Sequence, residues 1–180
     1  MGYSARPICV DDLEQIMIWR QDPDITKWMN TDPKLTLEGQ KQWLSEIQQN
    51  QNCRFWVIEV DGSPVGILDY FDLDKETGIV HWGYYVGARE HRSMALALSL
   101  ELSLYEHCFD NLGLEIVKNE VFAENVGVIK LHELCGNRIV EVEKDAVEKR
   151  DGFHDVVHME ITREAWKALQ APNYEKLDLI

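Results

Sequence analysis

One segment of the chain joins two kinds of secondary structure at a place suited to binding phosphate. It reads Arg92-Ser93-Met94-Ala95-Leu96-Ala97, follows a β-branched and aromatic run from Ile79 to Gly87, and precedes a Leu- and Ala-rich run to about Phe109. A helix that starts directly after a strand leaves its first N–H groups unpaired at the positive end of its dipole. We therefore expect a phosphate- or pyrophosphate-bearing ligand there. The alternative is an ordinary strand-to-helix turn.

The composition predicts one acidic, folded domain over residues 1–180. A length of 180 residues with 45% hydrophobic residues is enough for one sizeable core. The formal net charge of −14 argues against a nucleic-acid partner, which requires a basic face. This charge would suit a cationic substrate, although an acidic surface that favours solubility explains it more simply.

Two absences predict the cellular compartment. No apolar run approaches the roughly 20 residues that span a bilayer, and the N-terminus lacks the apolar core of a signal peptide. We therefore expect a cytoplasmic protein with no membrane partner. The cysteines are scattered and form no ligand cluster, which predicts reduced thiols and no metal site. They are Cys9, Cys53, Cys108 and Cys135.

The first elements to position the segment are two helices and an antiparallel meander. Apolar spacing predicts a helix from Asp11 to Arg20, with Asp11 or Asp12 as N-cap, and a second from Thr36 to Gln49. A turn from Gln21 to Asp24 separates them. Three strands with intervening turns follow. They run from Arg54 to Val60, Val65 to Leu73 and Ile79 to Val86.

The segment after Arg92 fits two periodicities. Leucines alternate from Leu96 to Leu104, which is a strand pattern. The Leu, Ala, Glu and Met content, the absence of β-branched residues and the length favour a helix, which we predict.

The remaining elements complete an α+β fold with a mixed sheet. The predicted order is a strand, a helix, a hairpin of two strands around Asp151-Gly152 and a short terminal helix. These run from Glu115 to Phe122, Asn125 to Leu134, Arg138 to Val147, Phe153 to Ile161 and Glu164 to Gln170.

With these elements in place, the chain resembles the GCN5-related N-acetyltransferase family. That family carries an Arg/Gln-x-x-Gly-x-Gly/Ala loop between a strand and a helix, then a strand and a helix that begins with Asn. The matching pieces here are Arg92 to Ala97 and Asn125 to Gly136. The resemblance implies a mostly antiparallel sheet of six to seven strands flanked by about four helices. It also implies a core of about residues 5–163 followed by a short tail, 164–180.

Within the family, the chain is most similar to the UDP-linked amino-sugar N-acetyltransferases of the pseudaminic acid pathway. The matching pieces are Trp19-Arg20-x-x-Pro23-Asp24-Ile25, Trp28-Met29, Gly66 to Tyr70 and Gly83-Tyr84-Tyr85. Ribosomal-protein acetyltransferases share a Trp-Arg-x-x-Pro opening.

Three positions depart from the family pattern. Ala95 stands where the first glycine is usual, and its methyl group intrudes where a pyrophosphate approaches. Asn137 stands where Phe is usual. His132 stands where a Tyr often protonates the departing thiolate, a task that an imidazolium can also perform.

The resemblance implies acetyl-CoA as cosubstrate, with no metal, and direct attack by a free amine. It implies that the third strand, near Tyr84 to Val86, polarises the acetyl carbonyl and holds the cofactor arm. Asn125 and Lys130 are further cofactor-binding candidates, with helix capping and a solvated lysine as their alternatives. The full expected cofactor set is Tyr85, Val86, Arg92, Ser93, Met94, Ala95, Leu96, Ala97, Asn125 and Lys130.

For catalysis, we expect His81 to accept the proton of the amine and His132 to protonate the leaving thiolate. The alternatives are a half-buried packing residue for His81 and a surface histidine for His132. Asp69 is a second base candidate, with a structural or substrate-orienting role as its alternative. An aromatic wall with one arginine would suit a nucleotide sugar, whereas core packing is the alternative for most of these residues. The expected acceptor set is Trp19, Arg20, Trp28, Asp69, Tyr70, Trp82 and Tyr84.

The expected function is acetyl transfer from acetyl-CoA to the amine of a UDP-linked 4-amino-4,6-dideoxy sugar. Two alternatives stay open, namely acetylation of a protein N-terminus or a polyamine, and a non-catalytic acyl-CoA-binding domain. A homodimer is compatible with the resemblance.

Overall fold

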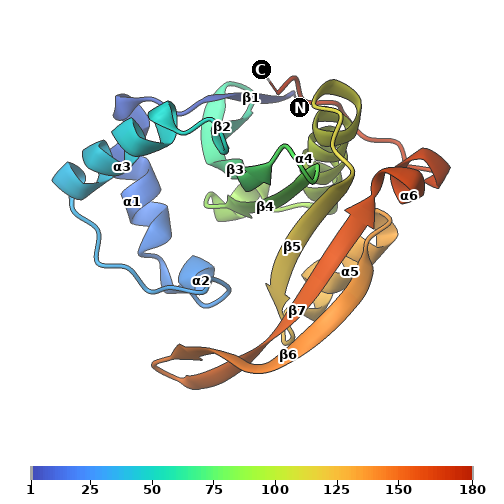
Figure 1. Cartoon of the computed structure of the whole chain (residues 1–180). Helices are drawn as coiled ribbons and strands as arrows, with labels where there is room; N and C mark the ends of the chain where they lie inside the picture. Colours follow the sequence, from blue (N-terminus) through green and yellow to red (C-terminus); the bar gives the residue numbers. More distant parts are fainter. Residues whose placement is uncertain (1, 180) are drawn as a thin grey trace.

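A computed structural model describes residues 2–179, and a seven-stranded mixed sheet is its centre (Figure 1). The strand order is β1-β2-β3-β4-β5-β7-β6, and among these described strands only the β4–β5 pair is parallel. The strands are β1 (Tyr3–Pro7), β2 (Arg54–Val60), β3 (Ser63–Asp74), β4 (Ile79–Val86), β5 (Ile116–Phe122), β6 (Arg138–Lys149) and β7 (Gly152–Thr162). The predicted α+β class and mostly antiparallel sheet are confirmed.

Within residues 2–179, six α-helices flank the sheet where the sequence predicted about four. They are α1 (Leu13–Arg20), α2 (Pro23–Thr26), α3 (Leu37–Gln49), α4 (Met94–Glu106), α5 (Val126–Leu134) and α6 (Arg163–Ala168). The additional short helix α2 replaces an expected turn, because Pro23 opens it and the Asp22 carboxylate accepts a hydrogen bond from the Asp24 N–H. Thr36 and Ser93 cap α3 and α4 in the same way.

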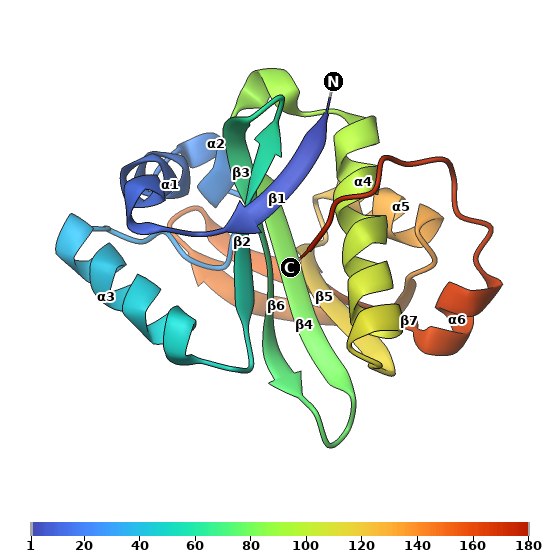
Figure 2. The same cartoon turned by 90° about the horizontal axis from the view of Figure 1, so that it is seen from above.

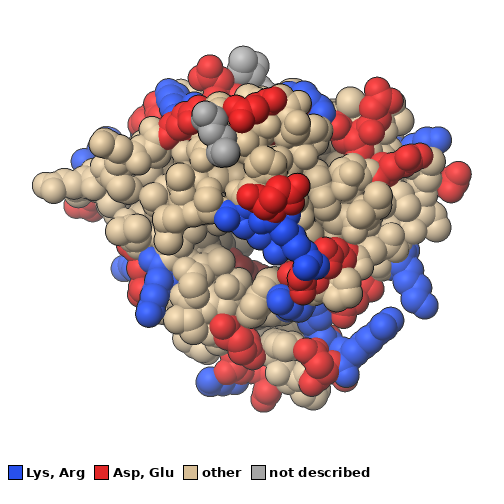
Figure 3. Space-filling model, turned by 180° about the vertical axis from the view of Figure 1, so that it is seen from behind, with Lys and Arg blue, Asp and Glu red and all other residues tan. Residues whose placement is uncertain are grey.

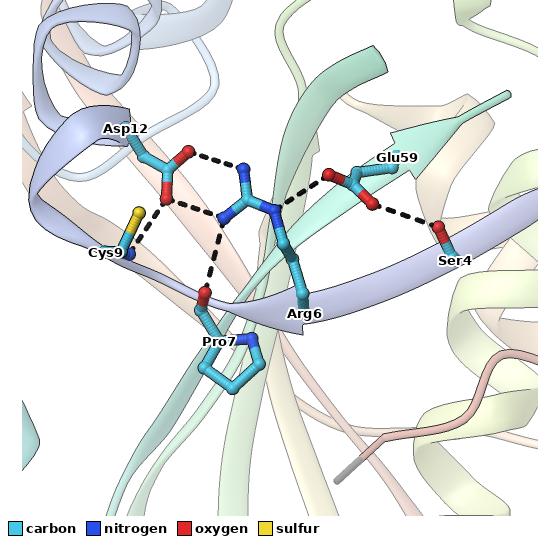
Figure 4. A network of polar contacts seen from close by, with 6 residues as sticks. All are labelled: Ser4, Arg6, Pro7, Cys9, Asp12 and Glu59. Carbon is cyan, nitrogen blue, oxygen red and sulfur yellow. Dashed lines mark hydrogen bonds and ion pairs between the residues drawn. The ribbon is translucent and has the colours of Figure 1, made fainter. Parts of the chain in front are cut away.

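Strand β1 was not predicted, because its alternation of apolar and polar residues spans only five residues and includes no Val, Ile or Thr. Arg6 anchors it (Figure 4). Its guanidinium donates to Asp12 at 2.7 and 2.8 Å and to Glu59 of β2 at 2.8 Å. Burial opposes ionisation of Asp12, but the bonds from Arg6 and the Cys9 N–H hold the pKa of that carboxyl below its ordinary value. Asp12 therefore ties β1 to α1, and its side chain does not cap the helix as predicted.

Helices cover both faces of the sheet (Figure 2). On one face, α1 and α3 pack through Leu13, Ile16 and Leu44 against Val57 and Ile67. On the other face, α4 packs against the opposite side chains of the same strands in the largest core cluster.

Helix α4 is buried on nearly all sides, which explains its alternating leucines. Leu96, Leu100, Leu102 and Leu104 are at most 1% exposed, so no single face needs to be apolar. The C-terminal segment adds to this enclosure, since Leu177 is buried in the same core cluster. Its N–H donates to Ser103 Oγ of α4 at 2.9 Å.

Strands β4 and β5 separate after a short common stretch. They are paired only over Ile79–His81 and Ile116–Lys118. Beyond these residues, β4 stays with β3, whereas β5 follows β7 and β6 away from it (Figure 1). This divergence leaves the inner edges of two strands without each other as partners, and it defines the place where a ligand can enter the sheet.

Candidate functional site

Two adjoining cavities, of about 580 and 410 Å³, lie at the divergence of β4 and β5. We call them the first and the second cavity. Both are lined from β4, from β5 and from residues after α2. The shared lining residues are Trp28, Met29, Trp82, Gly83, Tyr84, Tyr85, Asn119 and Glu120.

Three buried polar atoms at this junction have no hydrogen-bond partner among residues 2–179. They are Trp82 Nε1, Tyr85 Oη and Asn119 Oδ1. Buried polar groups in folded proteins are nearly always paired, so a cluster of unpaired ones indicates a place for polar ligand atoms. All three belong to residues that line both cavities.

The first cavity contains an acidic group above a glycine. A Cβ built on Gly83 would meet only Asp69 Oδ1, at 3.8 Å, so the carboxylate stands over an otherwise open stretch of β4. Removal from water raises the pKa of Asp69 to about 7, although the nearby Arg20 cation lowers it. Asp69 is therefore poised to exchange a proton near neutral pH. His81 also lines this cavity, half-buried beside Phe71.

An aromatic wall with one guanidinium completes the first cavity. Arg20 contacts Met29 Sδ and donates to Thr31 Oγ1 at 3.3 Å, which holds its charge at the cavity. Trp28, Trp43 and Phe55 supply aromatic surface.

Two predicted acceptor residues lie elsewhere. Tyr70 faces the α4 side of the sheet, where it packs with Trp56 and His107. Trp19 is 7% exposed and packs on Gly87 and Tyr85, outside both cavities. Core packing, the stated alternative, holds for these two.

The second cavity reaches the N-terminus of α4. Among Arg92 to Ala97, three N–H groups are used within the protein: Arg92 bonds to Arg89 O, and Leu96 and Ala97 bond to Ser93. The N–H groups of Ser93, Met94 and Ala95 have no such acceptor in the described chain. The available anion-binding set is therefore narrower than the six residues that the sequence suggested.

The other candidates around the second cavity differ in position. Arg92, Ser93, Ala97, Val86 and Asn125 line it. The Arg92 guanidinium bonds to Val86 O at 2.8 Å.

Asn125 and Lys130, the two cofactor-binding candidates at α5, differ in their position. The Asn125 side chain makes no capping bond to α5, so capping does not account for it. Lys130 is exposed and lines neither cavity, as its alternative of a solvated lysine describes. Leu96 is buried in the core.

His132 is buried rather than at the surface, and it lines the second cavity. Its Nδ1 lies 2.9 Å from Glu101 Oε1, and its ring meets the Trp82 ring edge-on at 5.5 Å between centroids. Nε2 has no hydrogen bond to residues 2–179. One ring nitrogen is thus held by a carboxylate while the other is free for a ligand.

The loop above both cavities, residues 26–32, is held by a distant lysine. Lys149, at the end of β6, has a side chain 5% exposed and donates to Thr26 O at 2.5 Å and Met29 O at 2.8 Å. Its Nζ lies 3.0 Å from Asp32 Oδ1. Figure 1 shows the β6–β7 hairpin reaching back below α2, where these contacts form.

Sequence reasoning missed Lys149 and Glu101 as contributors to the site. Glu101 carries a local signal, because it is the one charged residue among the Leu, Ala and Ser residues of α4 before Glu106, four residues before Tyr105. Lys149 carries none, since its contacts are more than a hundred residues away in sequence.

The arrangement can therefore move two protons on opposite sides of one gap. Asp69 faces the first cavity, His132 faces the second, and free N–H groups at α4 can hold an anion. Among residues 2–179, no group of three or more His, Cys, Asp or Glu side chains is arranged to hold a metal ion. In the same range, no helix has the length and apolar character needed to cross a membrane.

Comparison with known families and proteins gives consistent matches. A family model described as "Acetyltransferase (GNAT) domain" matches residues 5–138. The chain is 26% identical over 128 residues to the SPbeta prophage-derived uncharacterized N-acetyltransferase YokL of Bacillus subtilis, covering 71% of each chain. It is 22% identical over 134 residues to acetyltransferase PseH of Campylobacter jejuni, covering 74% of this chain and 82% of that one.

Among solved structures, the fold is similar to that of spermidine N-acetyltransferase from Vibrio cholerae in complex with CoA and spermine. The TM-score is 0.87 at 17% identity, and the match covers 92% of this chain and 98% of the other.

Proposed function

Because the chain belongs to the acetyltransferase (GNAT) family and is an N-acetyltransferase, we propose that it transfers acetyl from acetyl-CoA directly to the free amine of a UDP-linked 4-amino-4,6-dideoxy sugar. The observation that carries the acceptor is the first cavity, where Arg20 and Asp69 stand in an aromatic wall. The similarity to PseH, although only 22% identity, supports the same substrate class.

The size and chemistry of the first cavity support a nucleotide-linked acceptor. About 580 Å³ lies within the range of sites for small organic ligands. Trp28, Trp43 and Phe55 offer planar surfaces for a base or the apolar face of a sugar. Arg20 offers planar donors for a phosphate.

The second cavity supports acetyl-CoA as the donor. The N–H groups of Ser93, Met94 and Ala95 would hold its pyrophosphate, because they point out of the start of α4 without protein acceptors. Met94 is 60% exposed, so the chain around Ala95 is open to solvent. The β4 backbone from Tyr84 to Val86 would hold the pantetheine arm, and Asn119 Oδ1 and Tyr85 Oη would meet polar ligand atoms at the gap.

The residues on the two sides of the gap have complementary tasks. Bound acetyl-CoA supplies a thioester carbonyl carbon that an amine can attack. Asp69 takes the proton of the attacking amine on its carboxylate, since its pKa of about 7 lets it serve as a base near neutral pH. His132 gives the proton on Nε2 to the departing sulfur. Each proton transfer thus has its own residue.

Asp69 has a stronger position than His81 for the base. It stands directly over Gly83, where β4 leaves β5, whereas His81 lies at the last paired position of the two strands. We assign to His81 a supporting position beside Phe71 in the acceptor wall.

Arg20→Gln tests the acceptor assignment most sharply. We expect it to raise KM for the UDP-linked amino sugar about tenfold or more, with a smaller effect on kcat, because a charge-assisted bond to phosphate is worth about 1.5–3 kcal/mol. Lys167→Gln, which removes an exposed positive charge on α6, is the matched control. Equal KM values for Arg20→Gln and wild type would contradict a phosphate at this position.

A further inference from the structure

We propose that the buried carboxylate of Glu101 is a positioning residue of the reaction, which fixes His132 with Nδ1–H bound and Nε2 directed to the cofactor cavity. The inference rests on the proposed function, because the role of His132 as proton donor belongs to it. Glu101 itself touches neither cavity.

Glu101 Oε1 is the centre of a buried polar network. It lies 2.9 Å from His132 Nδ1 and accepts from Tyr105 Oη at 2.7 Å and Asn137 Nδ2 at 3.3 Å. Asn137 Nδ2 also reaches Tyr105 Oη at 2.7 Å, and its Oδ1 accepts from Asn119 Nδ2 at 3.1 Å. The network therefore links α4 and α5 to β5 at the cavity edge.

Burying this network costs free energy, because its charged and polar groups lose their hydration. Glu101 is 0% exposed in a helix that is otherwise packed with leucine. A buried carboxylate loses its hydration, and well-packed apolar residues in place of a buried ion pair are often equally or more stabilising. When the His132 ring is protonated, it forms with the Glu101 carboxylate an ion pair of no net charge. The attraction within this pair offsets much of the lost hydration free energy.

The hydrogen bonds determine the tautomer. Asn137 donates to Tyr105 Oη, so Tyr105 donates onward to Glu101, and the carboxylate can only accept. Nδ1 of His132 must then carry the hydrogen, which leaves Nε2 as the nitrogen that gains and gives a proton. In the transfer, the Nε2–H bond breaks and a hydrogen–sulfur bond forms, while the Nδ1–H bond stays intact and donates its hydrogen bond to Glu101. Solvent reprotonates Nε2 for the next cycle.

The other titratable groups facing this pair stay neutral. Burial, reinforced by the charge of Glu101, raises the pKa of Tyr84, of Tyr105 and of the Cys135 thiol well above their ordinary values. Tyr84, Tyr105 and Cys135 therefore do not supply the proton that the departing sulfur takes up.

The test uses side-chain ¹⁵N NMR of the full-length protein without ligand, with His132→Gln to assign the signal. In wild type we expect the Nδ1–H tautomer. In Glu101→Gln we expect this tautomer preference to be lost, because the amide that replaces the carboxylate can donate to Nδ1 as well as accept from it. His158 pairs with Glu143 and Glu120 near the surface, and its ring ¹⁵N signals serve as an internal reference. These signals should be the same in wild type and Glu101→Gln.

Kinetics supply the second readout. We expect Glu101→Gln to lower kcat about tenfold or more and to shift the pH profile of kcat, with KM for acetyl-CoA little changed. In a His132→Tyr background, the same substitution should have no further effect on kcat. If Glu101→Gln does not fold, Glu101→Asp keeps the charge but withdraws it from Nδ1, and it should weaken the tautomer preference.

The outcomes separate two failures. A wild type that acetylates the sugar nucleotide, with the His132 tautomer unchanged in Glu101→Gln, overturns this inference alone. A wild type that acetylates no amine overturns the proposed function and, with it, any role of Glu101 in the reaction, whatever the NMR signal shows.

Discussion

At the residue scale, the raised pKa of Asp69 should make the reaction rate depend on pH. With its pKa at about 7, we expect kcat/KM to rise with pH through neutrality, and Asp69→Asn to lower it about 10²-fold or more. Asp72→Asn, at an exposed position on the same strand, is the matched control. A pH–rate profile on both variants checks this. An Asp69→Asn enzyme with the wild-type profile would remove Asp69 from the mechanism.

The same shift has a consequence for stability. The folded-state pKa is raised above the ordinary 3.8, so the folded state holds a proton that the unfolded chain releases. The free energy of unfolding should therefore fall as pH rises from about 4 to about 7, and Asp69→Asn should flatten this part of the profile. Urea denaturation across that range measures it.

Gly87 lies too close to the Trp19 side chain to leave room for a Cβ. A Cβ there would stand 2.3 Å from the Trp19 indole, so we expect Gly87→Ala to destabilise the protein by about 1–3 kcal/mol. Gly127→Ala in α5 is the control, because nothing lies within 4 Å of its Cβ, and it should gain up to about 1 kcal/mol. Thermal unfolding of the pair decides it, and a stable Gly87→Ala would show that Trp19 can shift freely.

The alternation of side chains along a strand predicts the sheet face on which a single residue lies. Asp69 and His81 share one face of the sheet, whereas Tyr70 follows Asp69 and must point to the other, which is why it packs beside α4. Trp82 and Tyr84 also point to the α4 side, yet they line both cavities because the open edge of β4 exposes both of its faces. That edge depends on long-range pairing, which spacing along the chain does not indicate.

At the element scale, periodicity predicted most helices and strands, since each buries a regular face. The prediction of helix α4 depended on its residue types, because a helix buried on nearly all sides does not show the usual helical spacing of apolar residues. The network from Glu101 to Asn119 could not be predicted, because it joins α4, α5 and β5 through side chains distant in sequence.

The β6–β7 hairpin holds the loop of residues 26–32 in place through Lys149. Lys149→Met removes the donor that holds residues 26–32 over the cavities, so we expect faster hydrogen exchange in that loop and about tenfold higher KM for the acceptor. Lys144→Met, at a lysine whose side chain is 74% exposed on the same strand, should change neither. Unchanged exchange in Lys149→Met would show that the loop is held by other contacts.

At the scale of the whole molecule, charge works against an anionic substrate. The net charge of −14 repels a nucleotide sugar, so binding must depend on local donors such as Arg20 and the α4 N–H groups. Figure 3 shows Lys and Arg mixed with Asp and Glu around a hollow on one face, so neither sign of charge dominates there.

The two cavities meet from opposite sides of the diverging strands, so a donor and an acceptor can be held at once, and we propose that the acceptor is the UDP-linked amino sugar. Mass spectrometry of a mixture of enzyme, acetyl-CoA, UDP-linked 4-amino-4,6-dideoxy sugar, spermidine and a peptide with a free N-terminus tests it most directly. We expect one acetyl group on the sugar amine for each CoA released, with spermidine and peptide unchanged. Acetylated spermidine or peptide beside an unmodified sugar nucleotide would contradict it.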